Sequence, residues 1–340
     1  MRPGTLLASA LCAIALSACG GTGPAAPQAA PPAAVTTPPP APAFATTAFP
    51  NTSGHRGVPL TGDTMSTTVA ADGTFAFSNR FEWAIVSFFP NGATMSGSFD
   101  GGGPAAFGRG ADGALYSGFS VPAGNDLASE VHSGSRTWSF AAYPPLVILG
   151  GPDAATWVLT MTGGMVRLNA DGTTTTLPVA APPGDAYDVT LGPDGAFWLA
   201  EFDGTIERVP LQGPALRFSV GGQPLSIVAG ADGALWFLDK AQSAVRRMTT
   251  SGAVRTMFST SGFTLADRVA RGGDGAVWVT NGTTNELIRV AVDGSSARYP
   301  APSAGIQASG VTSAPDGTLY FVETNQAGLL IVHATPATAH

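Results

Sequence analysis

Cysteine, histidine and charged side chains are scarce in this 340-residue chain. It has two cysteines, four histidines and 11% charged residues. The net charge of −7 provides no basic surface, so nucleic acid is not expected as a partner. The apolar stretch from Leu6 to Ala15 is too short to span a bilayer as a stable helix, and no second apolar run is long enough. A 3.6-residue period is also absent, which excludes helical repeats of the ankyrin or TPR type.

The N-terminus has the features of a secretion signal. Its apolar stretch ends in Leu16-Ser17-Ala18-Cys19, which resembles a bacterial lipobox, where the cysteine thiol accepts diacylglycerol before cleavage. We therefore expect residues 1–18 to be a lipoprotein signal peptide and Cys19 to be lipidated. A plain signal peptide, with a cysteine that happens to follow the cleavage site, is the alternative. The mature chain would keep this one cysteine, which leaves no internal disulfide. Residue 20 is Gly rather than the Asp that would signal retention in the inner membrane. In a two-membrane bacterium this resembles a signal that sorts the lipoprotein to the outer membrane.

Residues 19–43 are expected to form a disordered tether. After Cys19 they are almost wholly Ala, Pro, Gly and Thr, and no charge occurs between Arg2 and Arg56. Such a segment has too little to bury, and its prolines favour an extended chain. It would hold residues 44–340 off the membrane of the cell envelope. A recognition segment for a proline-binding partner is the alternative.

A turn motif recurs along residues 44–340 every 38 to 42 residues. The seven turns fall at Asp72-Gly73, Asp112-Gly113, Asp153-Ala154, Asp194-Gly195, Asp232-Gly233, Asp274-Gly275 and Asp316-Gly317. Each is preceded by a short apolar strand and followed by an alternating strand such as Ala234 to Leu238. A third strand and a polar fourth strand complete most units. We therefore predict an all-β fold, a seven-bladed β-propeller of four-stranded antiparallel blades.

An aromatic residue stands four positions after the turn Asp in six of the seven units. The residues at this position are Ala76, Tyr116, Trp157, Trp198, Trp236, Trp278 and Tyr320. We expect them to fill the space between adjacent blades, with ligand stacking as the alternative. Four arginines lie in register on the third strands: Arg167, Arg208, Arg247 and Arg289. We expect them to pair with carboxylates or carbonyls at the blade edges, with a basic binding stripe as the alternative.

The last unit ends one strand short. The segment Phe44 to Pro50 resembles the fourth strands of other units, such as Thr174 to Pro178. We predict that it pairs outside the strand from Leu329 to His333 and closes the ring, because an unpaired edge would otherwise remain at the seam. The first two units match the repeat poorly, and their segments Gly101 to Phe107 and Val121 to Ser135 are candidate functional loops.

The run from Gly192 to Glu201 (GPDGAFWLAE), with Gly230 to Asp239 and Ile206 to Val209, is similar to the repeat of the streptogramin B lyase (virginiamycin B lyase) family. The resemblance covers the last five units well and also extends to NHL-type and gluconolactonase-like propellers. It implies an enzyme that opens a cyclic depsipeptide antibiotic at its ester by elimination, with Mg²⁺, a histidine base and a Glu-x-His pair near the axis.

This chain departs from that pattern at its histidines. Seven residues before each turn Asp, where the family histidine stands, are Met65, Ala105, Leu146, Tyr187, Leu225, Asp267 and Ser309. The second histidine would stand two residues beyond the family glutamate, where Asp203, Ala241, Thr283 and Asn325 occur. The histidines present, His55, His132, His333 and His340, lie away from the expected axis. The sequence therefore does not support the histidine-dependent mechanism.

Seven residues after the turn Asp, most units carry a polar residue. These candidate rim residues are Asn79, Thr160, Glu201, Asp239, Asn281 and Glu323. Equivalent positions of a propeller share one face, so we expect a polar cluster at one mouth of the channel. Glu201, Asp239 and Glu323 could hold Mg²⁺ or Ca²⁺ there, although no cofactor is certain, and a solvated rim would look the same.

Two functions remain open. The first is an envelope-anchored, monomeric binding or scaffold module for a protein, peptide or glycan. The second is a metal-assisted lyase or a lactonase-type enzyme at the channel mouth. Whether the chain is an enzyme stays undecided, because no catalytic residue can be named. Gly-x-Ser-x-Gly, P-loop and dinucleotide motifs are absent.

Overall fold

The computed structural model describes residues 42–50, 64–79, 84–91, 93–98, 106–123, 126–141, 144–161, 164–179, 186–302, 307–325 and 328–335. All of them belong to one compact unit, residues 38–340. Among them are strands and turns but no helix, and hence no helix able to span a membrane. Cys19, the expected signal peptide, His55 and His340 lie outside the described residues.

The strands form six sheets. One sheet holds β2 (Thr64–Val69), β3 (Phe75–Asn79), β4 (Ala84–Phe88) and β5 (Thr94–Ser98). The next holds β6 (Ala106–Arg109), β7 (Leu115–Ala123), β8 (Asp126–Ser133), β9 (Arg136–Phe140), β10 (Pro145–Gly150), β11 (Thr156–Thr160), β12 (Gly164–Leu168) and β13 (Thr174–Pro178). A third holds β14 (Ala186–Leu191), β15 (Phe197–Glu201), β16 (Thr205–Val209) and β17 (Leu216–Ser219).

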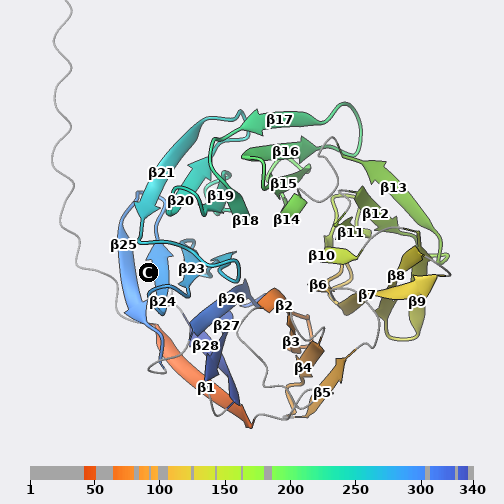
Figure 1. Ribbon diagram of the computed structural model, residues 1–340, viewed down its shortest axis with the longest axis horizontal. Helices are drawn as coiled ribbons and strands as arrows, with labels where there is room; N and C mark the ends of the chain where they lie inside the picture. The colour runs from red at the N-terminus through yellow and green to blue at the C-terminus, as the bar shows by residue number, and fades with distance from the viewer. Residues whose placement is uncertain are drawn as a thin grey trace, which may run out of the picture. The chain divides into compact units, whose positions relative to one another are not determined.

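The remaining three sheets follow the same order. The fourth holds β18 (Pro224–Ala229), β19 (Leu235–Asp239), β20 (Ala244–Met248) and β21 (Val254–Ser259). The fifth holds β22 (Val269–Arg271), β23 (Val277–Asn281), β24 (Glu286–Val290) and β25 (Ser296–Pro300). The sixth holds β26 (Gln307–Ser313), β27 (Leu319–Asn325), β28 (Gly328–Thr335) and β1 (Ala43–Pro50). In Figure 1 these sheets stand in a β-propeller-like ring with β2, β6, β10, β14, β18 and β26 near its centre.

One sheet has eight strands, where the sequence predicted separate four-stranded blades. Its halves join through a short parallel pairing of β6 with β10, in which Gly108 faces Ile148 and Arg109 faces Leu149. A Cβ at Gly108 would lie 1.8 Å from the Ile148 carbonyl oxygen. The two inner strands therefore meet because residue 108 has no side chain.

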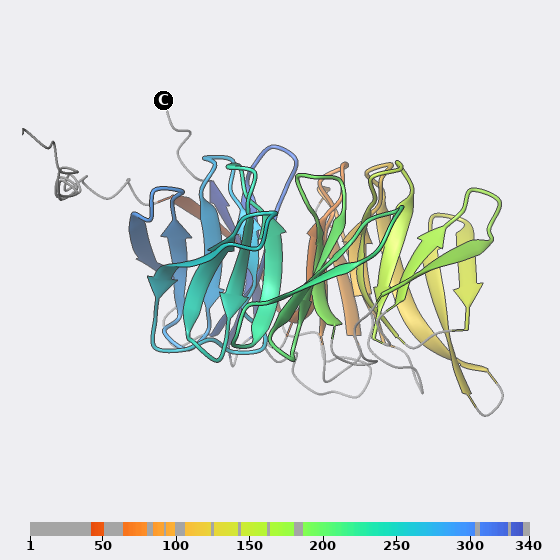
Figure 2. The same cartoon turned by 90° about the horizontal axis from the view of Figure 1, so that it is seen from above.

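The long hairpin of β7 and β8 occupies most of a segment that the sequence analysis proposed as a loop. Val121 pairs with Ala128, and Ser133 pairs with Arg136 of β9. In the side view this hairpin, coloured yellow, extends beyond the neighbouring strands (Figure 2). Val121 to Ser135 is thus largely strand.

The N-terminal strand β1 lies beside the C-terminal strand β28. The two pair antiparallel from Ala43 with Thr335 to Pro50 with Gly328. The segments that are farthest apart in the sequence are thereby joined by backbone hydrogen bonds.

The turn aspartate, the aromatic residue and the third-strand arginine form one repeated contact, here named the clamp. In the third sheet, Asp194 Oδ1 accepts from Trp198 Nε1 at 2.9 Å and Asp194 Oδ2 accepts from Arg208 Nε at 2.6 Å. The same contacts recur in three further sets: Asp153 with Trp157 and Arg167, Asp232 with Trp236 and Arg247, and Asp274 with Trp278 and Arg289. The predicted pairing of these arginines with carboxylates is confirmed.

The hydrophobic core lies between neighbouring sheets. One cluster joins Trp198 and Ala200 of β15 to Ile227 of β18 and to Leu235 and Phe237 of β19. Each indole in such a cluster removes about 150–250 Å² from water. The packing role predicted for the repeated tryptophans is confirmed, because Trp198, Trp236 and Trp278 are buried in these clusters.

Candidate functional site

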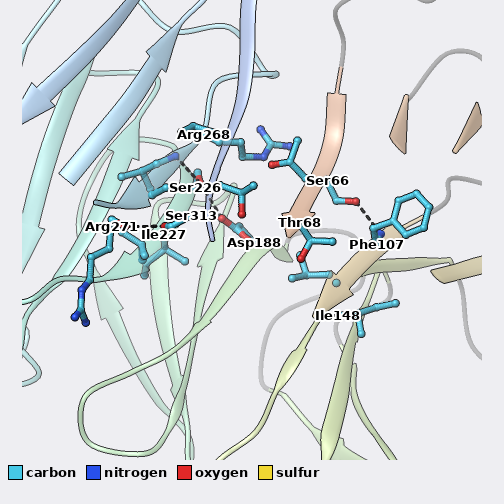
Figure 3. A pocket seen from close by; sticks show the side chains of 18 residues that line it. Ser66, Thr68, Phe107, Ile148, Asp188, Ser226, Ile227, Arg268, Arg271 and Ser313 are labelled. Carbon is cyan, nitrogen blue, oxygen red and sulfur yellow. Dashed lines mark hydrogen bonds between the residues drawn. The ribbon is translucent and has the colours of Figure 1, made fainter. Parts of the chain in front are cut away.

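A cavity of about 230 Å³ lies where seven inner strands meet, and we name it the axial cavity. Its lining comes from β2, β6, β10, β14, β18, β22 and β26, together with Arg268, which directly precedes β22. Figure 3 shows Asp188, Ser226, Arg268 and Ser66 around this space. A cavity that draws on every inner strand is the place where the repeat can build a site from residues far apart in sequence.

Inner-strand irregularities position two of these polar residues. The pairing of β14 shifts register between Ala186 and Asp188, and that of β18 shifts between Pro224 and Ser226. Such bulges change the direction of the side chains beside them. Asp188, Ser226, Arg268 and Ser66 all stand six residues before a turn aspartate. That shared spacing is the sequence signal for this site, and it lies one residue beyond the position at which the family resemblance places a histidine.

Asp188 connects three inner strands. Its Oδ2 accepts from Ser226 Oγ and from the Ile227 N–H, both at 2.9 Å. Ser226 Oγ in turn accepts from the Val269 N–H of β22 at 3.3 Å. Burial raises the pKa of Asp188, while the positive charge of Arg268 and these hydrogen bonds act in the opposite direction.

Arg268 and Tyr187 hold the loop that precedes β22. The Arg268 guanidinium donates to the carbonyl oxygens of Leu265 at 2.8 Å and Asp267 at 2.9 Å, and its central carbon lies 5.4 Å from the Tyr187 ring centroid. Tyr187 Oη donates to the same Leu265 carbonyl at 3.0 Å. The Phe202 ring packs edge-on against Tyr187, with centroids 4.5 Å apart. The Arg268 charge is therefore held in place beside the axial cavity.

Asp267 fastens the same loop from inside the protein. It is fully buried, and its two oxygens accept from the Thr264 N–H at 2.6 Å and the Gly282 N–H at 2.7 Å. Burial raises the pKa of Asp267 to about 7, against the lowering effect of those backbone donors. It stands where the family resemblance places a histidine, but it does not line the axial cavity.

The candidate rim residues are buried, so the expectation of a solvated rim is wrong for those that the structure describes. Those whose side chains the structure describes are Thr160, Glu201, Asp239, Asn281 and Glu323, each with no exposed surface. They stand at or near the ends of second strands. Glu201 and Asp239 bind groups of their own sheets, whereas Asn281 Nδ2 donates to Thr260 Oγ1, just beyond β21 of the preceding sheet, at 3.0 Å. Asn281 Oδ1 accepts from the Thr283 and Thr284 N–H groups of the next turn. The Asn79 side chain lies outside the described residues.

Two of the acids proposed as metal ligands bind arginines instead. Asp239 Oδ2 accepts from Arg246 at 2.8 Å, and its Oδ1 accepts from the Gln223 and Gln242 N–H groups. Glu201 Oε2 accepts from Arg217, which also contacts Asp203. Burial and the neighbouring Glu207 carboxyl raise the pKa of Glu201 to about 8.

The described part of the chain contains no group of three His, Cys, Asp or Glu residues able to hold a metal. The donor set does not fit Mg²⁺ or Ca²⁺.

The one histidine with a described side chain is His132, on β8. Its ring stacks on Phe119 with centroids 4.9 Å apart, and its Nε2 lies 3.2 Å from Glu130 Oε2. His132 is not among the residues that line the axial cavity. His333 lies in β28, but its side chain is outside the described residues.

Comparisons with known proteins agree with this architecture. The model of the virginiamycin B lyase family matches residues 138–332. A virginiamycin B lyase from Nocardia farcinica is 30% identical over 180 residues, which cover 52% of this chain and 61% of that protein. The match thus spans less than two thirds of that relative.

Solved structures show the same fold. A streptogramin B lyase aligns with a TM-score of 0.67 and 19% identity over 86% of this chain and 98% of that one. A catalytically inactive virginiamycin B lyase from Staphylococcus aureus, solved with quinupristin, aligns with a TM-score of 0.67 and 21% identity over 86% and 99%. The WD40 propeller domain of Doa1 aligns with a TM-score of 0.60 at 13% identity, over 81% of this chain and 93% of that one. Because the family model matches more than half of the sequence, the chain belongs to the virginiamycin B lyase family.

Proposed function

We propose that this protein is a membrane-anchored binding module whose axial cavity receives a polar group of a peptide or glycan. The observation that carries the proposal is the lining of that cavity. Among the described lining residues, Asp188 and Arg268 supply a carboxylate and a guanidinium beside several hydroxyls, Arg271 is a second arginine, and none is a histidine. A cavity of about 230 Å³ is smaller than a drug-sized pocket, so it suits a peptide terminus or one sugar.

Thermal stabilisation by dipeptides with free termini and by short oligosaccharides tests this function. A ligand that uses both charges should raise the melting temperature of the wild type in a saturable manner. Asp188→Asn and Arg268→Gln should each remove the shift, whereas Asp171→Asn, at an exposed turn, should retain it. A shift that survives in both cavity variants would refute the role of the cavity.

The second candidate is an enzyme of the lyase or lactonase type. It is favoured by family membership and by Asp188, whose raised pKa and position beside the cavity suit a carboxylate that takes up a proton. Incubation with quinupristin, followed by mass spectrometry, separates the two functions. Turnover by the wild type that Asp188→Asn abolishes would establish the enzyme. Absence of turnover together with saturable ligand binding would leave the binding module.

The membrane anchor is a separate proposal that rests on the lipobox-like run ending at Cys19. We expect the wild type in the membrane fraction, in the outer membrane if the organism has two membranes, and Cys19→Ser in the soluble fraction. Retention of the variant with the membrane would contradict lipidation at this residue.

For the architecture, we propose seven blades closed by the N-terminal strand. The proposal treats the two halves of the eight-stranded sheet as two blades and β1 as the outer strand of the last. It is supported by the seven turn motifs and by the β1–β28 pairing. Deletion of residues 43–50 should sharply lower the melting temperature, because it exposes the edge of β28. An unchanged melting temperature would contradict closure by β1.

A further inference from the structure

A second cavity, of about 510 Å³, continues the channel toward the Asp-Gly turns, and we name it the turn-side cavity. It shares Thr68, Ile148, Thr312 and Ser313 with the axial cavity. Its other lining residues come later along the inner strands, such as Thr190 of β14 and Arg109 at the end of β6. Its volume lies within the range of small-molecule sites.

Among the described residues that line the turn-side cavity, Arg109 is the only charged one. Its side chain is exposed, and within the described residues its guanidinium has neither a hydrogen-bond nor an ion-pair partner. The nearby turn acid is already engaged, because Asp112 accepts from the Ala114 N–H and from Tyr116 Oη. The clamp arginines, by contrast, each hold an aspartate. This cation is therefore available to a ligand.

The chain holds the backbone of Arg109 firmly at the cavity. Close contact at Gly108 pairs β6 with β10 and places Arg109 opposite Leu149. The following turn is fixed as well, since the Ala111 N–H donates to Thr156 Oγ1 at 3.2 Å. The guanidinium thus extends from a backbone that is ordered before any ligand binds, which reduces the entropic cost of binding.

Neutral donors line the same space. Thr68, Thr190 and Thr312 stand at equivalent positions, four residues before a turn aspartate. Within the described part of the chain their hydroxyls have no hydrogen-bond partner, so they too are free for a ligand. Ser313 Oγ, in contrast, donates to the Arg271 carbonyl at 2.6 Å.

We propose that the turn-side cavity binds an anion of the carboxylate or phosphate class. The Arg109 fork would donate to its oxygens, and the threonine hydroxyls would complete the set. None of the described lining residues is a carboxylate that would repel such a ligand, although the protein as a whole carries a net charge of −7. This site is separate from the Asp188–Arg268 pair and does not depend on the proposed function.

Calorimetric titration of the full-length protein with citrate and, separately, with inorganic phosphate tests the proposal at constant ionic strength. We expect saturable binding of at least one of them, and the tighter of the two identifies the ligand class. Loss of a charge-assisted hydrogen bond should make Arg109→Gln bind about tenfold more weakly or worse. Thr190→Val should weaken binding severalfold, and Arg109→Lys should lie between Arg109→Gln and the wild type.

Arg136→Gln is the matched control, because Arg136 is an exposed arginine on β9 that does not line the cavity. This variant should bind the anion as the wild type does. Absence of saturable binding to either anion would overturn the proposal. So would equal losses in Arg109→Gln and Arg136→Gln, which would indicate general charge screening.

Discussion

Replacement of Asp274 by Asn tests the clamp that recurs around the ring. Asn keeps one oxygen for the Trp278 indole but presents an amide N–H to Arg289, whose Nε lies 2.6 Å from the lost carboxylate oxygen. The Asp274 and Arg289 side chains are 3% and 15% exposed. Removing one partner of such a buried pair costs about 3 kcal/mol, because the remaining charge keeps its desolvation penalty.

The same substitution at Asp194 provides the internal comparison. Asp194 and Arg208 are 25% and 24% exposed, so water compensates the arginine and the expected cost is about 1 kcal/mol. Burial alone would raise the pKa of Asp194, but hydrogen bonds from Trp198 and Arg208 lower it. A lowered pKa in the folded state means stability that is present above the unfolded pKa and is lost as pH falls below it.

Urea unfolding of both variants at pH 7, followed by tryptophan fluorescence, measures the two costs. The double variant Asp274→Asn with Arg289→Leu should lose less unfolding free energy than the sum of the losses in the two single variants, because it leaves no unpaired guanidinium. Asp171→Asn, at an exposed turn, should leave the midpoint unchanged. A loss of unfolding free energy in Asp274→Asn that is no larger than the loss in Asp194→Asn would contradict the dependence of the clamp on burial.

Three further changes test other features. The pKa of Glu201 rises from 4.5 to about 8 on folding, so this carboxyl favours the native state only while it is protonated, and the wild type should lose stability as the pH rises from 4.5 to 8. Glu201→Gln should reduce this decrease in the free energy of unfolding. A variant with the same pH dependence as the wild type would contradict this. Gly108→Ala should lower the unfolding midpoint far more than Gly164→Ala. A Cβ at residue 108 would lie 1.8 Å from the Ile148 carbonyl oxygen, whereas a Cβ at residue 164 would lie 3.4 Å from Thr160 Oγ1. Equal midpoints in the two variants would contradict the role of Gly108. Tyr187→Phe should speed amide hydrogen exchange in residues 264–268, because the 3.0 Å bond to Leu265 is lost, and unchanged exchange would contradict it.

The sequence predicted two parts of the clamp, the packing of the aromatic residue and the pairing of the arginine with a carboxylate or carbonyl, but not the hydrogen bond from tryptophan to the turn aspartate. The two predicted parts are local in the repeat. The aspartate and the tryptophan are four residues apart, and the arginine follows on the next hairpin strand. The sequence predicted that the candidate rim residues stand at strand ends, but it did not predict that their side chains are buried. Asp239 and Asn281 accept from backbone groups of the turns beside them, which draws their side chains inward.

The axial site was harder to predict because it depends on backbone irregularities. Nothing in the local pattern marks the register shift beside Tyr187, although that shift precedes Asp188 at the cavity. The joining of β6 to β10 depends likewise on one glycine, Gly108, in a segment that matches the repeat poorly. The Gly108 contact joins two strands that are forty residues apart in sequence, and the local pattern of one strand does not encode such a tertiary contact.

The hydrogen bond from Tyr187 to the Leu265 carbonyl passes over a whole sheet, because β14 and the loop before β22 are separated by the sheet of β18. In a repeat protein whose units touch only their neighbours, unfolding can advance one unit at a time. This second-neighbour contact, with the Asp188–Ser226–Val269 chain beneath it, makes the three sheets beginning at β14, β18 and β22 mechanically interdependent. Under an applied force, these three sheets should rupture together as one block, because opening any one of them breaks contacts to the other two.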